Sequence, residues 1–321
     1  METVKLKAEG GVAQRLEGAR VADEIKREVA EEVARLREGH GFTPRLAVVQ
    51  VGDDPASTIY VRNKVRTCEE LGLGSERHAL PEGTTDAELL SLVQELNRRD
   101  DVDGFLVQLP LPRGMNESAI VEAIDPDKDV DGFNPVNVGR LILRKPALVP
   151  CTPAGIVELL VREGVQIAGA RVCVVGRSNL VGRPMAELLL QRDATITICH
   201  SRTRCLETVT READILIAAV GRAGIIRAEH VKPGAVVIDV GTNKVTDEAE
   251  VRELFGEAAK KRLASLGARG YTVVGDVHPA EVSAVASRLT PVPGGVGLLT
   301  VAMLMKNTVT AARRRRGIEQ L

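Results

Sequence analysis

Aromatic residues are scarce in this sequence: they make up 2% of its 321 residues, and tryptophan is absent. The hydrophobic cores must therefore be aliphatic, and a surface that stacks on nucleic-acid bases is not expected. The formal net charge is −1, so no large field steers the protein toward nucleic acid or a membrane. The one basic run, residues 313–316, is interpreted as a solvated helix end that complements the helix dipole.

The sequence also lacks a cysteine framework and a long apolar run. Its five cysteines are odd in number and scattered, with no C-x-x-C pair, so neither a disulfide scaffold nor a zinc site is expected. Cys173 and Cys199 fall in apolar strand-like runs and are interpreted as small core residues. Residues 1–11 are too short and charged for a signal peptide, and no run has the length of a membrane span. We expect a reducing, cytoplasmic environment.

The length suits two domains, and the hydrophobic pattern alternates between helical and strand periods. In the first half, this pattern predicts helices over residues 18–38, 57–71 and 85–98 and strands over 46–51, 77–80 and 104–108. Residues 110–153 are rich in proline and aspartate, so we expect few regular elements and a passage between domains there.

In the second half the pattern predicts a helix over 152–163 and strands over 172–175, 195–199, 214–219, 235–240 and 272–275. Intervening helical segments favour a doubly wound parallel sheet. A charged helical insertion at 248–268 has no assigned function, and a helix over 298–315 ends the pattern.

A strand, a glycine-containing turn and a helix follow one another in residues 171–185. Such a turn can present bare backbone N–H groups and a helix N-terminus to a phosphate. Gly176 and Gly182 are six apart, however, so the usual G-x-G-x-x-G spacing is not met and the motif alone is weak.

The end of the next strand, residues 199–204, carries no carboxylate that could accept a ribose hydroxyl. Its hydroxyl and guanidinium groups, together with Arg177, suit a 2′-phosphate and favour NADP over NAD. Each arginine taken alone could equally be a solvated strand-end residue. Gly221 and Gly241 follow two further strands, where they either let the backbone approach a ligand or simply turn the chain.

Two features of the first half are candidates for a catalytic or binding role. Tyr60 and Lys64 are four apart on a predicted helix and share a face, although such pairs are usually surface residues. Gln108 lies at the carboxyl end of a strand before a proline-rich turn. The carboxylates of residues 125–131 do not have the spacing of an EF-hand. Asp131 could instead bind an amino-heterocycle, with its neighbours solvated.

Taken together, these blocks closely resemble the bifunctional methylenetetrahydrofolate dehydrogenase/cyclohydrolase family of one-carbon metabolism. The matching blocks cover nearly the whole chain in order: SxxYVxxK (57–64), VQLPLP (107–112), KDVDGF (128–133), PCTPAG (150–155), GRSNLVGRP (176–184), CHSRT (199–203), KPGAVVIDVGTN (232–243), GDV (275–277) and TPVPGGVG (290–297).

The resemblance implies two α/β domains with a folate/NADP cleft between them: residues 1–149 bind folate, completed by the helix 298–321, and residues 150–297 form a Rossmann-like NADP-binding domain. It implies oxidation of 5,10-methylenetetrahydrofolate with NADP and hydrolysis of the methenyl product to 10-formyltetrahydrofolate. It also implies a homodimer, with tetrahydrofolate derivatives as the small-molecule partners and neither nucleic acid nor membrane.

The resemblance also assigns roles to individual residues. Lys64 would be the catalytic lysine, Gln108 would orient it, Asp131 would hold the pterin and Tyr60 would stack on the folate ring. Enclosure beside a cationic substrate would favour a neutral lysine able to take a proton from water. The further expected folate contacts are Val107, Leu109, Pro293, Gly294 and Gly295. The expected NADP contacts are Gly176, Arg177, Ser178, Val181, Gly182, Pro184, His200, Ser201, Arg202, Gly221, Gly241 and Thr242.

Three departures from the family pattern are visible. Position 298 is leucine where the family usually has proline at a first helical position, the insertion at 248–268 is longer than is common, and the first ten residues form an added tail. The rival hypotheses are a dehydrogenase without cyclohydrolase activity and a non-catalytic nucleotide-binding regulatory protein. Retention of Tyr60, Lys64, Gln108 and Asp131 argues against both.

Overall fold

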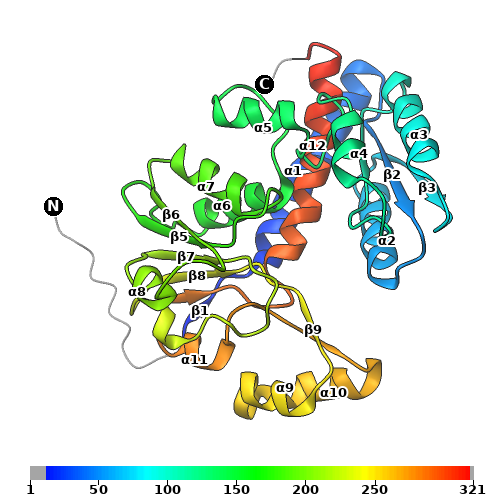
Figure 1. Cartoon of the computed structure of the whole chain (residues 1–321). Coiled ribbons are helices and arrows are strands. Elements are labelled where there is room, and N and C mark those ends of the chain that lie inside the picture. The colour runs from blue at the N-terminus through cyan, green and yellow to red at the C-terminus, as the bar shows by residue number, and fades with distance from the viewer. Residues whose placement is uncertain (1–11, 319–321) are drawn as a thin grey trace. The chain divides into compact units, whose positions relative to one another are not determined.

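The computed structural model describes residues 12–318, in which the chain forms two compact α/β units (Figure 1). Residues 22–154 and 300–318 build the three-stranded unit, and residues 12–21 and 155–299 build the six-stranded unit. The added tail expected at the amino terminus lies outside the described residues. Within them, no helix combines the length and apolarity needed to cross a membrane.

The three-stranded unit is a parallel sheet in the order β3-β2-β4, formed by β2 (Arg45–Val51), β3 (Gly74–Leu80) and β4 (Gly104–Val107). Six of the seven residues of β2 are buried, as expected of a central parallel strand. Figure 1 shows α2 (Pro55–Glu70) and α3 (Asp86–Arg98) beside this sheet. Both helices begin where the sequence provides a cap: Asp54 accepts the Ser57 N–H, and Thr85 forms a capping box with Glu88.

The expectation of few regular elements in residues 110–153 is wrong. This segment contains α4 (Glu117–Ala123) and α5 (Pro135–Ile142). Each begins at an asparagine whose side chain accepts a backbone N–H, and Pro135 stands at the start of α5, where a missing N–H costs nothing. The prolines here therefore start a helix as well as end one.

The six-stranded unit contains an all-parallel sheet in the order β1-β11-β8-β7-β5-β6. Its central strands are β5 (Arg171–Val175), β7 (Ile215–Ala218) and β8 (Val236–Asp239), with β6 (Thr195–Cys199) at one edge. The other edge is completed by β11 (Arg288–Leu289) and β1 (Gln14–Arg15). The helical elements are α6 (Cys151–Arg162), α7 (Gly182–Leu190), α8 (Leu206–Thr210), α11 (Pro279–Ser283) and a 3-10 turn (Ala228–His230).

The parallel doubly wound sheet is confirmed, but the strand predicted at 272–275 does not belong to it. β10 (Thr272–Val274) pairs antiparallel with β9 (Asn243–Val245) as a separate ribbon. The predicted insertion is helical and joins these two strands as α9 (Glu248–Phe255), a 3-10 turn (Gly256–Ala259) and α10 (Lys260–Arg269). The edge strands β11 and β1, of two residues each, were missed because they are too short to show a period.

The carboxyl-terminal helix α12 (Val296–Arg315) corrects two expectations. It starts two residues before Leu298, so that leucine is not a first helical position. The basic run is not simply a solvated helix end either, because Arg315 and Arg316 both pair with the fully buried Asp103. Arg316 also lies 4.0 Å from the ring centroid of Phe42. The run therefore anchors α12 to the three-stranded unit.

Candidate functional site

Lys64 projects from α2 on the same face as Tyr60, as the four-residue spacing predicts. The lysine is only 8% exposed, whereas Tyr60 is 45% exposed. The Lys64 ammonium donates a hydrogen bond to Gln108 Oε1 at 3.1 Å. Lys64 is enclosed and hydrogen-bonded to a neutral amide, so its environment differs from that of the lysine in a usual surface Tyr-Lys pair.

Gln108 directly follows β4, and hydrogen bonds hold both its backbone and its side chain in place. Its backbone N–H donates to the carbonyl of Val49 at 2.8 Å, which extends the ladder between β2 and β4. Its side-chain Nε2 donates to the Leu109 carbonyl at 2.6 Å, so the amide oxygen is the atom left for Lys64. The neighbouring Val107 is buried and Leu109 partly buried.

Asp131 lies in a turn that Asp129 holds together. The buried carboxylate of Asp129 accepts hydrogen bonds from the N–H groups of Gly132 and Asn134 and from the Asn137 side chain. Burial raises the pKa of Asp131, and the charge of Lys64 opposes that rise. These opposed influences indicate that Asp131 and Lys64 act on one another in the three-stranded unit.

The expectation that the neighbours of Asp131 are solvated is confirmed for Asp127, which is exposed, but it is wrong for Lys128 and Asp129. Burial raises the pKa of Asp129 to about 6 despite its hydrogen bonds, and both Asp129 and Lys128 are 1% exposed. Lys128 donates to the carbonyls of Leu96 and Arg99 at the end of α3, and burial lowers its pKa to about 8. These two residues therefore fix the turn and leave Asp131 as its partly exposed acid.

The turn after β5 is compact because its two glycines leave no room for a side chain. A Cβ on Gly176 would lie 2.1 Å from the Ala219 carbonyl oxygen, and one on Gly182 would lie 2.1 Å from the Gly176 carbonyl oxygen. Gly176 also has φ +129°, a conformation that favours glycine. The six-residue spacing thus gives a tight strand-to-helix turn without the usual fingerprint.

The N–H groups at the start of α7 are not bare, contrary to expectation. Ser178 Oγ accepts the N–H groups of Val181 and Gly182 at 3.2 and 3.4 Å, the Ser178 carbonyl accepts that of Arg183, and Pro184 has none. The N–H groups of residues 177–180 form no hydrogen bond within the described part of the chain. Any phosphate contact from this turn is therefore expected from these preceding residues rather than from the first turn of α7.

The end of β6 presents cations beside this turn within the six-stranded unit. The Thr203 hydroxyl accepts the His200 N–H at 2.9 Å, and His200 Nδ1 accepts the Arg202 N–H at 3.1 Å, so these groups shape the loop itself. Ser201 and Arg202 are exposed, as is Arg177. Neither arginine forms an ion pair within residues 12–318, so both are available to an anion.

Two buried aspartates, which the sequence patterns did not single out, organise the ends of β7 and β8. Asp276 is fully buried, and its carboxylate accepts three successive N–H groups, those of residues 220–222, at 2.6 to 3.0 Å. Asp239 accepts the N–H groups of Gly241, Asp276 and Val277. Burial raises the pKa of Asp239 to about 7. The recurrence of an aspartate within two residues of a glycine, in DVG (239–241) and GDV (275–277), was the available signal.

This network explains both glycines for which the sequence left two interpretations open. Gly241 has no space for a Cβ, because it would lie 2.3 Å from Asp276 Oδ1, and the following Thr242 is exposed. Gly221 has φ +69° and open space around it, so the turn itself favours glycine there. Packing and chain reversal account for both positions without a ligand.

The expected folate contacts divide between the two units. Pro293, Gly294 and Gly295 belong to the six-stranded unit, whereas Tyr60, Lys64, Gln108 and Asp131 belong to the three-stranded unit. In the loop that contains Pro293, Gly294 and Gly295, Gly295 packs against the Pro291 carbonyl, and Pro293 is exposed. Among the described residues, no group of three His, Cys, Asp or Glu side chains could hold a metal ion.

Two family models match the chain. Residues 16–131 match the tetrahydrofolate dehydrogenase/cyclohydrolase catalytic domain, and residues 150–316 match the NAD(P)-binding domain of the same enzymes. The chain belongs to the tetrahydrofolate dehydrogenase/cyclohydrolase family. The three-stranded unit holds most of the catalytic-domain match and is called the catalytic unit below, and the six-stranded unit is called the NAD(P)-binding unit.

Relatives in this family are similar over nearly their full length. The chain is 56% identical to the bifunctional protein FolD of Koribacter versatilis over 302 residues, which are 94% of this chain and 97% of the relative. Among solved structures, FolD of Campylobacter jejuni has a TM-score of 0.85 at 41% identity and covers 94% of this chain and 99% of its own. The Trypanosoma brucei enzyme, solved with NADP and an inhibitor, has a TM-score of 0.85 at 38% identity, over 95% and 99% of the two chains.

Proposed function

We propose that this enzyme oxidises 5,10-methylenetetrahydrofolate with NADP and hydrolyses the methenyl product to 10-formyltetrahydrofolate. The observation that carries the proposal is the enclosed Lys64, held by Gln108 and under the influence of Asp131, in a chain of this family. A non-catalytic nucleotide-binding protein would have no need of a buried lysine at this position. The retention of the whole set also argues against a dehydrogenase that has lost the hydrolytic step.

In the proposed hydrolysis, Lys64 in its neutral form takes the proton of the attacking water. The substrate is a cationic amidinium, and a like charge nearby disfavours the protonated lysine. Gln108 suits the orienting role because an amide oxygen can hold the amine without adding a carboxylate that would retain the proton. Asp131 would hydrogen-bond the pterin, and the exposed ring of Tyr60 would stack on it.

The NAD(P)-binding unit is suited to a nucleotide with a 2′-phosphate. NADP supplies the hydride acceptor when bound, and this step requires alignment rather than an acid or base. The compact turn between Gly176 and Gly182 would bind the pyrophosphate through the N–H groups of residues 177–180, which form no hydrogen bond in the described chain, with Val181 and Pro184 beside it. Arg177, Ser201 and Arg202 would bind the 2′-phosphate, since they are exposed and the arginines have no ion pair in the described chain. The remaining proposed nucleotide contacts are Ser178, His200, Gly221, Gly241 and Thr242.

The proposal extends to the roles of the two domains, the assembly and the location. We assign folate binding to residues 1–149 with the last helix and NADP binding to residues 150–297, and we add the loop residues Pro293, Gly294 and Gly295 to the folate contacts. The family resemblance supports a homodimer, which sedimentation equilibrium would test. The five cysteines are free, which suits a reducing cytoplasm.

A two-stage absorbance assay tests the function directly. The protein is mixed with methylenetetrahydrofolate and either NADP or NAD, and formation and decay of the methenyl compound are followed. We expect faster formation with NADP, followed by enzyme-dependent decay. Formation without enzyme-dependent decay would establish the monofunctional dehydrogenase instead, and no formation with either nucleotide would favour the regulatory alternative.

A further inference from the structure

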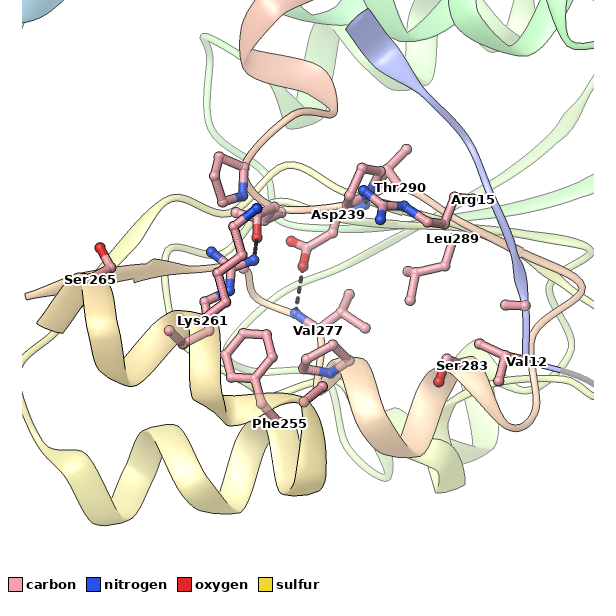
Figure 2. Close-up of a pocket in the computed structure, with 18 of the residues that line it drawn as sticks. Val12, Arg15, Asp239, Phe255, Lys261, Ser265, Val277, Ser283, Leu289 and Thr290 are labelled. Atoms are coloured by element: carbon pink, nitrogen blue, oxygen red, sulfur yellow. Dashed lines mark hydrogen bonds between the residues drawn. The ribbon is translucent and has the colours of Figure 1, made fainter.

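A cavity of about 640 Å³ lies within the NAD(P)-binding unit (Figure 2). The described residues that line it include none from the turn at 176–182, but they do include Pro293, a proposed folate contact. The walls of the cavity come from the helical insertion, from the edge strands β1 and β11, and from α11. Figure 2 shows Phe255 and Lys261 contributed by the insertion, with Arg15 and Asp239 contributed by strands. We call it the insertion cavity. Its volume is in the range of small-molecule sites.

The charged residues that line the insertion cavity are mostly cations. Arg15, Lys261, Arg262 and Arg269 line it, against one acid, Asp239. The Asp239 carboxylate is already engaged by three backbone N–H groups, and burial raises its pKa to about 7. The acceptor atoms of Asp239 are therefore directed at the backbone, and this carboxylate forms no ion pair with the lining cations in the described chain.

Arg262 is held in place by contacts that leave its charge uncompensated. Its guanidinium donates to the carbonyls of Val273 and Val292 and lies 4.8 Å from the ring centroid of Phe255. Burial lowers the pKa of Arg262, and the nearby positive charge of Arg15 lowers it further. Two guanidiniums that repel one another are stabilised by an anion between or beside them.

The remaining cations are unpaired or only weakly paired. Within residues 12–318, Lys261 and Arg269 form no ion pair. Arg15 pairs with Glu17 at 3.1 Å, but both side chains are largely exposed and such pairs exchange readily with solvent. An incoming anion would therefore displace no buried ion pair.

Most of the rest of the wall is apolar and includes Phe255, Val277, Leu289 and Pro291. Three hydroxyl-bearing residues also line it, namely Ser265, Ser283 and Thr290. We propose that the insertion cavity binds a small organic phosphate whose apolar body lies against the apolar side chains. Arginine forks and a lysine point charge together match a phosphate dianion better than a neutral or singly charged group. The site goes beyond the proposed dehydrogenase and cyclohydrolase activities, and it gives a role to an insertion for which they require none.

The experiment is calorimetric titration of the full-length protein with phenyl phosphate, with the nucleotide site saturated by NADP. The test variant is Lys261→Met with Arg269→Met, because both side chains are exposed and without an ion pair in the described chain, so the fold does not depend on them. Lys260→Met is the matched control, since this exposed neighbour does not line the cavity.

We expect phenyl phosphate to bind the wild type and Lys260→Met equally, and the double variant at least tenfold more weakly. Dehydrogenase turnover should be the same in all three proteins, which separates this result from the proposed function. The inference is overturned if the wild type gives no binding heat while NADP is bound, if the double variant binds normally, or if benzyl alcohol binds as tightly.

Discussion

Lys64 and Arg177 are the two cations on which the proposed chemistry most depends, and the chain positions them differently. Lys64 is 8% exposed and is held 3.1 Å from Gln108 Oε1, whereas Arg177 is exposed and has no ion pair in the described residues. The proton-transfer group is thus ordered before any ligand arrives, while the phosphate-binding group must lose side-chain freedom on binding. Catalysis gains from a fixed geometry, and nucleotide exchange gains from a loose one.

The largest effect is expected from replacing Lys64, the ordered cation of this pair. Lys64→Met removes the proposed base while keeping an unbranched side chain in the same enclosed space. We expect methenyl hydrolysis to fall by roughly 10³-fold, because general-base catalysis contributes on that order, while much of the dehydrogenase activity survives. The decay of methenyl absorbance measures the first and its formation the second. Arg62→Met, an exposed cation on the same helix, is the control, and normal hydrolysis in Lys64→Met would refute the assignment.

A smaller effect is expected from replacing the exposed residues that are proposed to bind the 2′-phosphate. Arg177→Ala combined with Ser201→Ala should weaken NADP binding by about 10- to 100-fold, since each lost contact is a hydrogen bond to a charged phosphate. NAD, which lacks that phosphate, should change by no more than about twofold. Nucleotide titration monitored by calorimetry gives both constants. Arg183→Ala, another exposed arginine beside the turn, controls for the general loss of positive charge. Equal losses for NADP and NAD would remove the 2′-phosphate interpretation.

The smallest effect concerns Asp239 and sharpens the comparison. This residue is buried, so the NAD(P)-binding unit contains an ordered charged group as well as the exposed Arg177. The pKa of Asp239 rises from an ordinary 3.8 to about 7 in the folded state, so the folded protein binds this proton more tightly than the unfolded chain. The resulting stabilisation is complete below pH about 4 and is lost as the pH rises toward 7. We expect the free energy of unfolding to fall by roughly 1–3 kcal/mol over that range from this group.

Urea denaturation at a series of pH values measures this slope, and Asp239→Asn is the comparison. The variant should be less stable overall because an amide nitrogen cannot accept the N–H groups that the carboxylate accepts. Its stability should depend less on pH than that of the wild type. Asp129, with a pKa of about 6, contributes a slope of the same sign in both proteins. Identical slopes would show that Asp239 does not titrate in this range.

The strands and helices with a full hydrophobic period could be predicted from the sequence, including β2, α3 and β5, because buried faces and caps leave a local pattern. The family and the α/β architecture followed from the ordered blocks. The edge strands β1 and β11 could not be predicted, since two residues carry no period and their pairing depends on partners distant in sequence.

The candidate site likewise has features that could be predicted from the sequence and features that could not. The Tyr60 and Lys64 face followed from helical spacing, but the hydrogen bond between Lys64 and Gln108 joins two elements and depends on tertiary structure. The GDV motif marks Asp276, but the role of its carboxylate could not be predicted, because the N–H groups that it binds lie more than 50 residues earlier in the chain. Ser178, conversely, satisfies N–H groups that the sequence suggested would be free, since a short hydroxyl can bond to its own turn.

Helix α12 has a consequence for how the chain matures. Its Asn307 side chain donates to the carbonyls of Val130 and Val149, and Arg316 binds the buried Asp103, so the catalytic unit is completed by residues that follow the NAD(P)-binding unit in the chain. The NAD(P)-binding unit is also discontinuous, because β1 precedes the catalytic unit and pairs with β11 after it. Neither unit can therefore fold from one continuous stretch of the chain, so each is expected to reach its native packing only once both of its segments have been synthesised.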